Sequence, residues 1–366
     1  MDDLARRVLL LAGRLGAHDD GWSICSFLER LEGLGISAQV LCVSRADGAG
    51  SDDRVVEFPA LGHRWHRVLG IRRLDFGGRL KVPGLMHVLH SAMEPVGVAI
   101  AEHWRLPYVQ TIDEFLAPSG RLRLSRRWCR GLVAVSRDLA DDLARILKVP
   151  GPMLSVVPPG IAAAEKATIS ARSAHVPVIG TAGPLVAASG FATFLVAARR
   201  VLDAGVDAEF VIAGQGEDEV DLRRRADRLR IADRMTFTGH PVVGLRFWNV
   251  LDVFCQTSLV PSVGRTLAMA LASGVPSIAS DVEGLRALVE DGVTGLRIPP
   301  GDSAALARTI LDLLRDPEGA RSLGARGREV IRRAFDPEAE ARNLVTVYHT
   351  VLDARPEPAK QVALMC

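Results

Sequence analysis

The stretch VIGTAGPLVAASGFATFLVAARRVLDAGVDAEFVIAG, residues 178–214, decides how this chain folds. It begins with a short apolar run, Val178–Ala182, and ends with another, Phe210–Ala213, and both fit strands that are buried on both faces of a sheet. Between them, residues 192–204 carry apolar side chains at helical spacing. A strand, a helix and a strand in this order predict a βαβ unit with two parallel strands.

The same alternation continues on both sides of this stretch. In the first half, apolar runs predict strands at Val8–Ala12, Ala38–Val43, Leu85–His90, Tyr108–Thr111 and Leu132–Ser136, and a helix over Trp22–Leu34. In the second half they predict strands at Met235–Thr238, Val253–Gln256, Ser277–Ala279 and Gly295–Ile298, and helices over Glu217–Leu229, Ala304–Leu314 and Pro337–Leu352. The fold class is therefore α/β, with two doubly wound, Rossmann-like parallel sheets.

The length of 366 residues also favours two domains, because one hydrophobic core rarely serves so long a chain. We expect a first domain over residues 1–165 and a second over 175–335, with a linker between Pro150 and His175 that holds a short strand, Leu154–Val157. The helix at 336–354 is expected to return toward the first domain, and residues 355–366 to form a loose tail. Ligands of such folds bind at the carboxyl ends of the strands, which here would face a cleft.

Composition narrows the class of protein further. With 45 basic and 43 acidic residues, the net charge of +2 gives no global case for binding nucleic acid. The five cysteines are scattered without a CxxC pair, so we expect neither a disulfide framework nor a zinc site, which fits a reducing cytoplasm. The N-terminus has too short an apolar run for a spanning helix or a signal peptide, and we interpret it as the first strand of a cytoplasmic protein.

Pattern alone leaves other tandem α/β proteins open, such as a periplasmic-type binding protein or a two-domain epimerase. Specific motifs narrow the choice. They include FVIAGQGEDEVDLRRRADRL from Phe210, IADRMTFTGH from Ile231 and VEDGVTGLRIPPGD from Val289. In these segments residues 178–349 resemble the donor domain of the retaining GT-B glycosyltransferases called group 1, or family 4. The first half resembles that family more weakly, at VAVSRDLADDL (133–143) and VVPPGI (156–161).

The resemblance implies a site for a nucleotide-sugar donor that needs no cofactor and no bound metal. The diphosphate would be held by backbone amides at a helix N-terminus and by cationic side chains. The implied donor contacts lie at Gly16, Gly183, Gly214 and Gly216, and in the loop Val263-Gly264-Arg265-Thr266. The alternative is an ordinary helix start with Ser262 as N-cap, and glycines that merely serve strand-to-helix turns.

Several family positions are altered in this chain. Where the family has an Arg and a Lys that grip the donor diphosphate, this sequence has Pro184 and Ser189. Where it has two Glu residues, eight apart, that hold sugar and ribose hydroxyls, this sequence has Pro261 and Met269. Losing two cations removes charge-assisted contacts of roughly 1.5–3 kcal/mol each. The donor site is therefore expected to be degenerate at these four positions.

In the first domain the family's usual histidine is replaced by Asp113, which Glu114 follows. These two carboxylates are the candidate catalytic residues, as sugar ligands or as acid/base groups; the alternative is two solvated acids that cap the next segment. Arg265 is a candidate cation for the phosphate, or else a surface residue that begins a helix. His87 and His90 at a strand end, and Arg14 in the first loop, are weaker candidates.

Two basic segments lie in the first half, one from His63 to Arg73 and one from Arg121 to Arg130, the second with interleaved apolar residues. A helix of this composition can lie on an anionic membrane surface, and the family often acts on lipid-linked acceptors there. The alternative is a solvated basic face. The protein is therefore expected to be cytoplasmic, with a peripheral position at the membrane left open.

Two functions follow from this sequence. The first is a retaining glycosyltransferase with an altered donor site, acting on a glycan or lipid-linked acceptor. The second is a catalytically silent GT-B protein that binds a glycan or scaffolds an active transferase in a surface-polysaccharide pathway. A nucleotide-sugar hydrolase is a third. Binding of nucleotide sugars would distinguish the first from the second.

Overall fold

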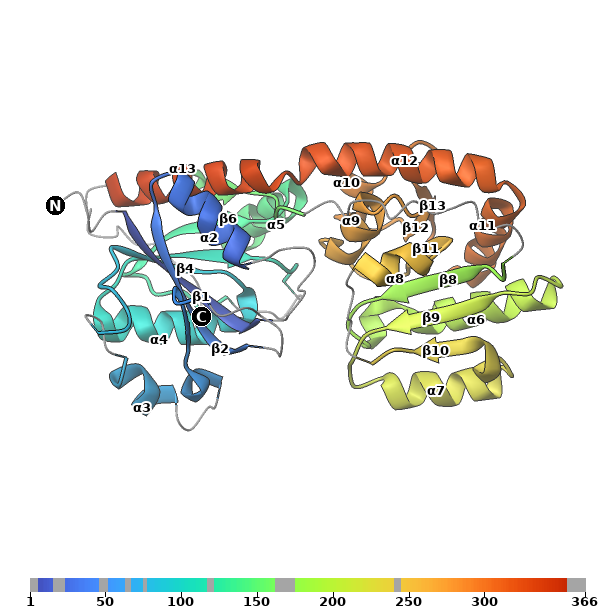
Figure 1. Ribbon diagram of the computed structural model, residues 1–366, viewed down its shortest axis with the longest axis horizontal. Helices are drawn as coiled ribbons and strands as arrows, with labels where there is room; N and C mark the ends of the chain where they lie inside the picture. Colours follow the sequence, from blue (N-terminus) through green and yellow to red (C-terminus); the bar gives the residue numbers. More distant parts are fainter. Residues whose placement is uncertain are drawn as a thin grey trace. The chain divides into compact units, whose positions relative to one another are not determined.

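The computed structural model describes residues 6–15, 24–45, 52–62, 67–74, 78–116, 122–161, 175–239 and 245–353. The chain divides into two compact units (Figure 1). Unit 1 is the chain up to Gly160 together with the segment that begins at Pro337, and unit 2 is Ile161–Asp336. The last described helix, α13 (Pro337–Asp353), thus belongs to the same unit as the first strand.

Unit 1 is built on a parallel sheet of seven strands in the order β3-β2-β1-β4-β5-β6-β7. The strands are β1 (Arg7–Leu15), β2 (Ser37–Arg45), β3 (Val55–Glu57), β4 (Leu85–Val88), β5 (Tyr108–Ile112), β6 (Cys129–Ala134) and β7 (Leu154–Val156). The chain winds to one side of β1 first and then returns to the other side from β4 onward. The junction between β1 and β4 is therefore the topological switch point of this sheet.

Helices cover both faces of this sheet because alternate residues of each strand point to opposite sides. Val8 and Leu10 of β1 share a core with α2 and α13, whereas Leu9 and Leu11 share one with the α4 side. The helices are α2 (Ile24–Gly33), α3 (Arg67–Arg72), α4 (Glu94–Trp104), α5 (Arg137–Leu147) and α13, with single turns η1 (Pro59–Gly62), η2 (Ser91–Met93) and η3 (Gly151–Met153).

Unit 2 repeats this design with six parallel strands in the order β10-β9-β8-β11-β12-β13. The strands are β8 (Val178–Ala182), β9 (Glu209–Ala213), β10 (Met235–Phe237), β11 (Val253–Gln256), β12 (Ser277–Ser280) and β13 (Leu296–Ile298). Its switch point lies between β8 and β11. The order is that of a doubly wound nucleotide-binding sheet, which confirms the predicted fold class.

One face of the unit 2 sheet packs against α6 and α11, and the other against α8, α9 and α10. Asp302 begins α11 by accepting hydrogen bonds from the amides of Ala304 and Ala305, at 3.0 and 2.8 Å. The helices are α6 (Phe191–Asp203), α7 (Glu219–Arg228), α8 (Leu245–Val250), α9 (Arg265–Ala272), α10 (Leu285–Leu288), α11 (Ser303–Arg315) and α12 (Pro317–Ala334), with single turns η4 (Ala187–Ser189) and η5 (Ala232–Arg234).

Local differences from the sequence-based expectation concern the strand ends. β1 extends to Leu15, so Arg14 lies in a strand rather than in the first loop, and its side chain is exposed. β6 begins at Cys129, three residues before the predicted start. The short strand expected in the linker is β7, the edge strand of the unit 1 sheet. The three-residue strand β3 was not predicted, because so short a run carries no period.

The second basic segment is not a helix. Residues 122–128 form a loop and turn, and β6 follows. Leu122, Leu124 and Trp128 pack against the core on the α4 side, so they form no apolar stripe for a membrane. The guanidinium of Arg127 lies over the ring of Trp128, 5.2 Å from its centroid. The predicted helix over this segment is therefore wrong, whereas its binding to an anionic membrane surface stays a prediction. Residues 63–66 of the first basic segment lie outside the described residues.

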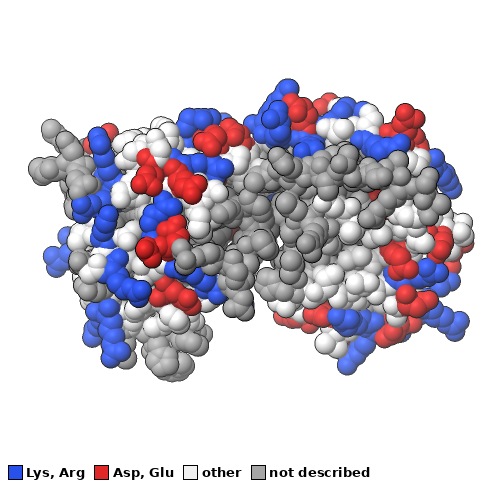
Figure 2. Space-filling view, in the orientation of Figure 1, with Lys and Arg blue, Asp and Glu red and all other residues white. Residues whose placement is uncertain are grey.

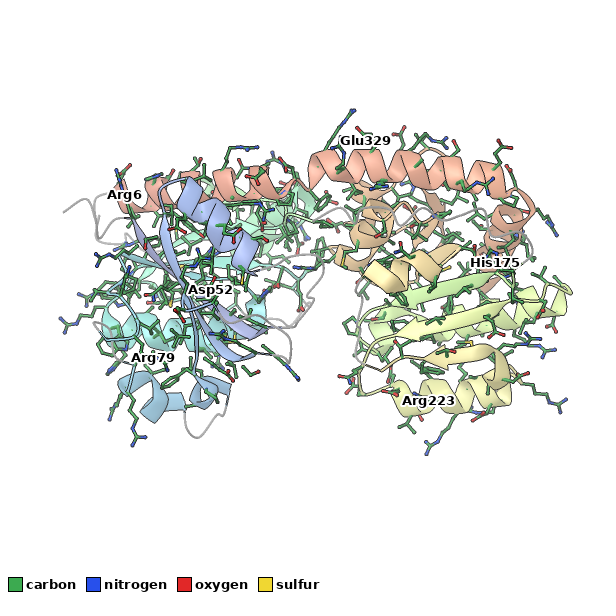
Figure 3. All side chains as sticks on the ribbon, in the orientation of Figure 1. Arg6, Asp52, Arg79, His175, Arg223 and Glu329 are labelled. Atoms are coloured by element: carbon green, nitrogen blue, oxygen red, sulfur yellow. The ribbon has the colours of Figure 1, made fainter. Side chains whose placement is uncertain are left out.

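Charged side chains are exposed on the outer surfaces of α7 and α12. Arg223 of α7 and Glu329 of α12 project from their helices (Figure 3). Arg223 pairs with Glu219 at 2.9 Å and lies over the ring of Phe237. Figure 2 shows basic and acidic side chains interspersed over the faces of both units that it displays. Among the helices of the described residues, none combines the length and the hydropathy needed to cross a bilayer.

Candidate functional site

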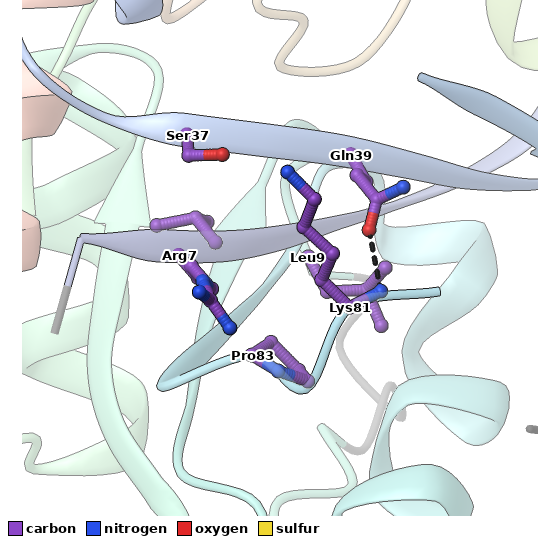
Figure 4. A pocket seen from close by; sticks show the side chains of 7 residues that line it. Arg7, Leu9, Ser37, Gln39, Lys81 and Pro83 are labelled. Atoms are coloured by element: carbon purple, nitrogen blue, oxygen red, sulfur yellow. Dashed lines mark hydrogen bonds between the residues drawn. The ribbon is translucent and has the colours of Figure 1, made fainter. Parts of the chain in front are cut away.

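The candidate site is sought where parallel strands end, because ligands of doubly wound sheets bind outside the carboxyl ends of the strands. We call this side of each sheet its carboxyl edge. A small pocket lies at the opposite end of unit 1, between Arg7, Ser37, Gln39 and Lys81 (Figure 4). The side chain of Gln39 is held there by the backbone amide of Lys81, at 2.7 Å. Because it lies at the amino ends of β1 and β2, this pocket is not the expected ligand site.

Glycines at the carboxyl edge of unit 2 let two backbone segments cross closely. A Cβ atom on Gly214 would lie 1.9 Å from the carbonyl oxygen of Gly183, and one on Gly216 would lie 2.3 Å from that of Leu185. The amide of Gly183 donates to the carbonyl of Ala213 at 2.9 Å. Packing within the chain is thus sufficient to require glycine at both positions, and the expected contact of Gly214 and Gly216 with a donor stays a prediction. Gly16 lies outside the described residues.

Helix α9 begins at this edge without a side-chain cap. Its N-cap is Gly264, with φ of 70°, rather than Ser262. The hydroxyl of Ser262 accepts a bond from the amide of Gly264, at 3.3 Å, one residue before the helix. A Cβ on Gly264 would lie 2.5 Å from a methyl carbon of Leu288, so this tight entry needs glycine. The N-cap residue Gly264 supplies no side chain to the first-turn amides, as suits an anion site at a helix start.

The altered family positions are dispersed around this helix start. Pro184 and Pro261 are exposed, and Ser189 donates its hydroxyl proton to the carbonyl of Pro184 at 2.7 Å. Met269 is only 4% exposed and belongs to the core beneath α9. Val263, Arg265 and Thr266 are half-buried. Among the described residues, Arg265 is thus the guanidinium placed at the start of α9.

The charge of the unit 2 edge is unfavourable for a diphosphate. The described loops that follow β8, β9, β11, β12 and β13 span residues 183–190, 214–218, 257–264, 281–284 and 299–302. They contain no Lys or Arg, and they contain the carboxylates Glu217, Asp218, Asp281, Glu283 and Asp302. Arg286 and Arg297 form ion pairs with Asp281, and their guanidinium nitrogens lie 2.7 and 3.3 Å from its Oδ1 atom. Backbone amides and Arg265 are therefore the candidate partners for an anion at this edge.

The carboxyl edge of unit 1 carries a network of polar side chains. Oδ2 of Asp113 lies 3.0 Å from Nδ1 of His90, and Oδ1 accepts the amide of Ser91 at 3.0 Å. The amide of Asp113 in turn donates to the hydroxyl of Ser91, at 3.3 Å. His90 and Asp113 follow the neighbouring strands β4 and β5, so the register of the sheet brings them together. The sequence pointed to each residue separately and missed the pair.

Asp113 and Glu114 differ in their ionisation. Burial alone would raise the pKa of Asp113, but hydrogen bonds from His90 and Ser91 outweigh it and hold the pKa below its ordinary value. The pKa of Glu114 is raised, first by partial desolvation and then by the charge of Asp113. Glu114 is exposed, whereas the Asp113 side chain is 26% exposed and engaged. Asp113 is therefore not one of two solvated acids.

His87 does not belong to the edge. It is 1% exposed, and its ring nitrogens lie 2.7 Å from the hydroxyls of Tyr348 and Thr111. Burial lowers its pKa to about 3, so the ring is neutral at physiological pH. Through Tyr348, this neutral ring ties α13 to the unit 1 sheet. Its role is structural.

Within the described part of the chain, no group of three or more His, Cys, Asp or Glu residues is placed to hold a metal ion. The cysteines Cys42, Cys129 and Cys255 are buried thiols. Burial raises the pKa of each, so all three are uncharged and poor metal ligands at neutral pH.

Two parallel sheets of this order, each with its own helical layers, define the class as the GT-B architecture. Solved structures agree over nearly the whole chain. The sucrose-phosphate synthase of Thermosynechococcus elongatus matches with a TM-score of 0.74 at 20% identity, covering 96% of this chain and 100% of its own. HepE of Anabaena, solved with UDP and glucose, matches with a TM-score of 0.73 at 16% identity, covering 93% and 98%.

Sequence comparison identifies a family that part of the chain matches. Residues 176–316 match the family model described as "Glycosyl transferases group 1". The chain therefore carries a group 1 glycosyltransferase domain in unit 2, which confirms the predicted resemblance for these residues. A phosphatidyl-myo-inositol mannosyltransferase of Mycobacterium leprae is 32% identical over 44% of this chain and 43% of its own length. A 2-deoxystreptamine glucosyltransferase of Streptomyces kanamyceticus is 28% identical over 67% of each chain. The chain thus spans less than half of the first of these relatives.

Proposed function

We propose that this protein is a glycosyltransferase that transfers a sugar from a nucleotide-sugar donor to a glycan or lipid-linked acceptor. The observation that carries the proposal is the group 1 domain, whose carboxyl edge presents the uncapped start of α9. Transfer proceeds with retention, as in the family that the sequence resembles. The protein acts in the cytoplasm, and a membrane surface enters only through a lipid-linked acceptor.

Backbone amides are the main diphosphate ligands in this proposal. A helix N-terminus favours an anion by roughly 0.3–1 kcal/mol at an exposed site, which is weak beside two lost cationic side chains. Arg265 is therefore the side chain that stabilises the negative charge of the leaving diphosphate. Arg265→Ala is expected to lower turnover more than tenfold, which corresponds to about 1.4 kcal/mol of transition-state stabilisation.

The experiment measures consumption of UDP-glucose, UDP-N-acetylglucosamine and GDP-mannose by the full chain in the presence of glycan and lipid-linked acceptors, with Arg308→Ala as the matched control. Arg308 is an exposed guanidinium on α11. Equal loss in both variants would contradict the role of Arg265. The reaction needs no bound metal in this proposal, so turnover should persist in EDTA. Activity that disappears in EDTA and returns with manganese would sink the metal-independent mechanism.

The second candidate function is a catalytically silent GT-B protein that binds a glycan or scaffolds an active transferase. The observation that favours it is the carboxylate-bearing, Lys- and Arg-free set of described loops at the unit 2 edge. Thermal shift with the same three nucleotide sugars separates the two functions. A ligand at 100 times its Kd stabilises the folded state by about 2.7 kcal/mol. If none of the three nucleotide sugars stabilises the protein or is consumed by it, the protein is the catalytically silent one.

A further inference from the structure

The two edges of the unit 1 sheet carry different charges. We call the side where its strands begin the amino edge. Because the strands are parallel, the loop residues that lead into them meet on this side. At the opposite, carboxyl edge, the described loops 58–62, 89–93, 113–116, 135–136 and 157–160 contain the acids Asp113 and Glu114 and no Lys or Arg.

The amino edge is basic. Its described loop residues are 6, 34–36, 52–54, 73–74, 78–84, 105–107, 125–128 and 148–153. They contain the exposed cations Arg6, Arg73, Arg79, Lys81, Arg105, Arg126, Arg127 and Lys148. The acids among them are Asp52 and Asp53, and Asp52 pairs with Arg54 at 2.7 Å. Figure 3 places Arg6 and Arg79 at the same end of unit 1, where Figure 2 shows several basic side chains.

Exposed apolar side chains gather at the same edge. Among the described residues of unit 1, the large apolar side chains that are exposed lie between 36% and 45% exposure, and they are Leu34, Val82, Trp104 and Ile146. Leu34 and Val82 lie in loops that lead into strands, and Trp104 and Ile146 lie in the last turns of α4 and α5. Tryptophan, other apolar side chains and arginine together have the composition of a protein interface.

Parts of this surface are held in place by hydrogen bonds. Oε1 of Gln39 accepts the amide of Lys81 at 2.7 Å, and its Nε2 donates to the carbonyl of Arg79 at 3.2 Å (Figure 4). The loop that carries both cations is thus tied to β2. The indole nitrogen of Trp104 donates to the carbonyl of Ile71 at 3.1 Å. A surface that is already ordered loses less conformational entropy when a partner binds.

The apolar side chains of the amino edge favour a protein partner over a lipid bilayer. A surface that binds a bilayer buries apolar side chains about 5–10 Å deep among the lipids, so those side chains must project. None of the four is more than 45% exposed, and Trp104 is bonded to the backbone. A partner that lies flat against the loops suits them better. The cations set the charge of this partner, since complementary charges favour association.

The amino edge is also large enough for a protein interface. Neighbouring strands lie about 4.8 Å apart, so the edge of this seven-stranded sheet extends over roughly 30 Å. A protein interface of standard size buries about 800 Å² on each partner, which a surface of this extent can supply.

We propose that the amino edge of unit 1 is a docking surface for a separate protein that presents carboxylates with interspersed apolar side chains. Arg79, Lys81 and Arg105 pair with the carboxylates. Val82 and Trp104 contact the apolar groups. Docking there leaves the carboxyl edge of unit 1 open, because the two edges lie at opposite ends of the strands. The interaction does not depend on the proposed glycosyltransferase function.

The test uses two acidic polymers, poly-L-glutamate and a copolymer of four glutamates to one tyrosine. Their binding to the full chain is measured by fluorescence anisotropy at about 0.15 M salt, where charges far apart are screened. We expect the copolymer to bind at least about threefold more tightly, because its tyrosine rings contact the apolar side chains. A copolymer that does not bind, or that binds no better than poly-L-glutamate, overturns the proposal.

The charge of the edge is tested by Arg79→Ala, Lys81→Ala and Arg105→Ala together, which should weaken copolymer binding about tenfold. The matched control removes the same charge from exposed positions on helices of unit 2, by Arg225→Ala, Arg308→Ala and Arg321→Ala. It should change the affinity less than about twofold. Equal loss in both triple variants means that net charge alone causes the binding, and it overturns the docking surface.

The apolar contacts are tested without a change of charge. Val82→Ser with Ile146→Ser should remove the advantage of the copolymer and leave the affinity for poly-L-glutamate as it is in the parent. Val220→Ser with Val330→Ser, at exposed positions of α7 and α12, is the control and should keep that advantage. An advantage that survives in the first pair, or is lost in both, overturns the apolar part of the surface and with it the proposal.

Two further measurements separate the other possible occupants. Vesicles of phosphatidylglycerol and phosphatidylcholine should bind the parent and the amino-edge triple variant equally, and sedimentation velocity should show the same oligomeric state for both. Vesicle binding that the triple variant loses would assign the edge to a bilayer. Self-association that the triple variant loses would assign it to a second copy of the chain. Either result overturns a separate acidic protein as the partner.

Discussion

Unit 1 and unit 2 share the strand order at their switch points, yet their carboxyl edges are built from different groups. The unit 1 edge carries side chains in a hydrogen-bonded network, centred on His90 and Asp113. The unit 2 edge is formed by backbone groups, which include the close chain crossing at Gly214 and the uncapped start of α9. The same fold thus presents a network of side chains at the carboxyl edge of one unit and backbone groups at that of the other.

The difference shows what each edge depends on. A site built from backbone groups keeps its shape when nearby side chains change, provided that the glycines still allow the chain segments to cross. Unit 2 can therefore have other residues in place of the family's Arg and Lys without a change in the shape of its edge. A side-chain site depends on ionisation and on strand register, and one substitution can reverse the donor and acceptor roles. Charge and conformation are therefore the two variables that can test the comparison.

The contrast continues inside the two sheets. His87 is the third residue of β4, beside β1, and Cys255 is the third residue of β11, beside β8. Both are buried. Burial lowers the pKa of His87 and raises that of Cys255, and both changes keep the side chain neutral. Only histidine, however, gains a charge on unfolding in mildly acidic solution.

The largest expected effect is therefore an acid sensitivity of unit 1 that unit 2 lacks. The pKa of His87 is about 3 in the folded state and about 6.5 in an unfolded chain. Between these values the unfolded state binds a proton that the folded state excludes, so stability falls as pH drops below 6.5. At about 1.4 kcal/mol per pKa unit, the loss reaches up to about 5 kcal/mol near pH 3.

Hydrogen exchange followed by mass spectrometry, corrected for intrinsic rates, can measure this in each unit between pH 7 and pH 4.5. We expect β4 to lose protection over that range while β11 keeps it. His87→Cys gives unit 1 the residue type found in unit 2. It should cost stability at pH 7, because Tyr348 and Thr111 lose their partner, but it should flatten the pH slope. An unchanged slope would show that other groups cause the acid loss.

The second effect tests the backbone edge of unit 2. Gly214→Ala places a Cβ 1.9 Å from the carbonyl oxygen of Gly183, so the two segments must separate. We expect a loss of about 3 kcal/mol or more in the free energy of unfolding. Gly205→Ala is the matched control, since Gly205 also has a positive φ, of 81°, but has open space at its Cβ position.

The control should cost about 1 kcal/mol, because only the left-handed backbone is penalised. Urea denaturation monitored by circular dichroism gives both numbers. If the two variants cost the same, the crossing does not restrict Gly214, and its glycine would then need a ligand-based explanation.

The sequence predicted the sheets well because their strands are apolar runs buried on both faces. Residues 178–214 show this directly: the structure places β8, α6 and β9 within one residue of the expected bounds. The helix expected over the basic segment was wrong because its apolar residues pack inward from a loop. Leucine and tryptophan spacing in a loop can imitate a helical stripe when no regular structure is present.

The candidate site was less predictable, because its chemistry depends on non-local contacts. Asp113 and Glu114 stand out as adjacent acids, but nothing in their neighbourhood names His90, which lies 23 positions away. Only the register between β4 and β5 brings the imidazole to Asp113. Likewise, the sequence shows a glycine at position 214 but does not show whether a ligand or another segment of the chain comes close to it.

The smallest effect concerns the missing cations of the unit 2 edge. Pro184→Arg restores one of them at an exposed position. Ser189 is left intact because its hydroxyl is bonded to the carbonyl of residue 184, and Met269 because a carboxylate there would be buried. An exposed ion pair contributes about 0.2–1 kcal/mol, so UDP should bind to this variant about 1.4-fold to fivefold more tightly than to the parent.

The matched control is Ala204→Arg, which adds the same side chain at the C-terminal end of α6. Because α6 runs from the carboxyl end of β8 toward the amino end of β9, this control lies at the opposite edge of the sheet. Calorimetric titration with UDP should show the gain for Pro184→Arg alone, and 0.5 M salt should abolish it, since screening at that ionic strength extends over only a few ångströms. If Ala204→Arg gains as much, the attraction is a general effect of net charge. If neither variant binds UDP more tightly than the parent, the diphosphate is not held at the start of α9. The unit 2 edge would then not be a site for this ligand.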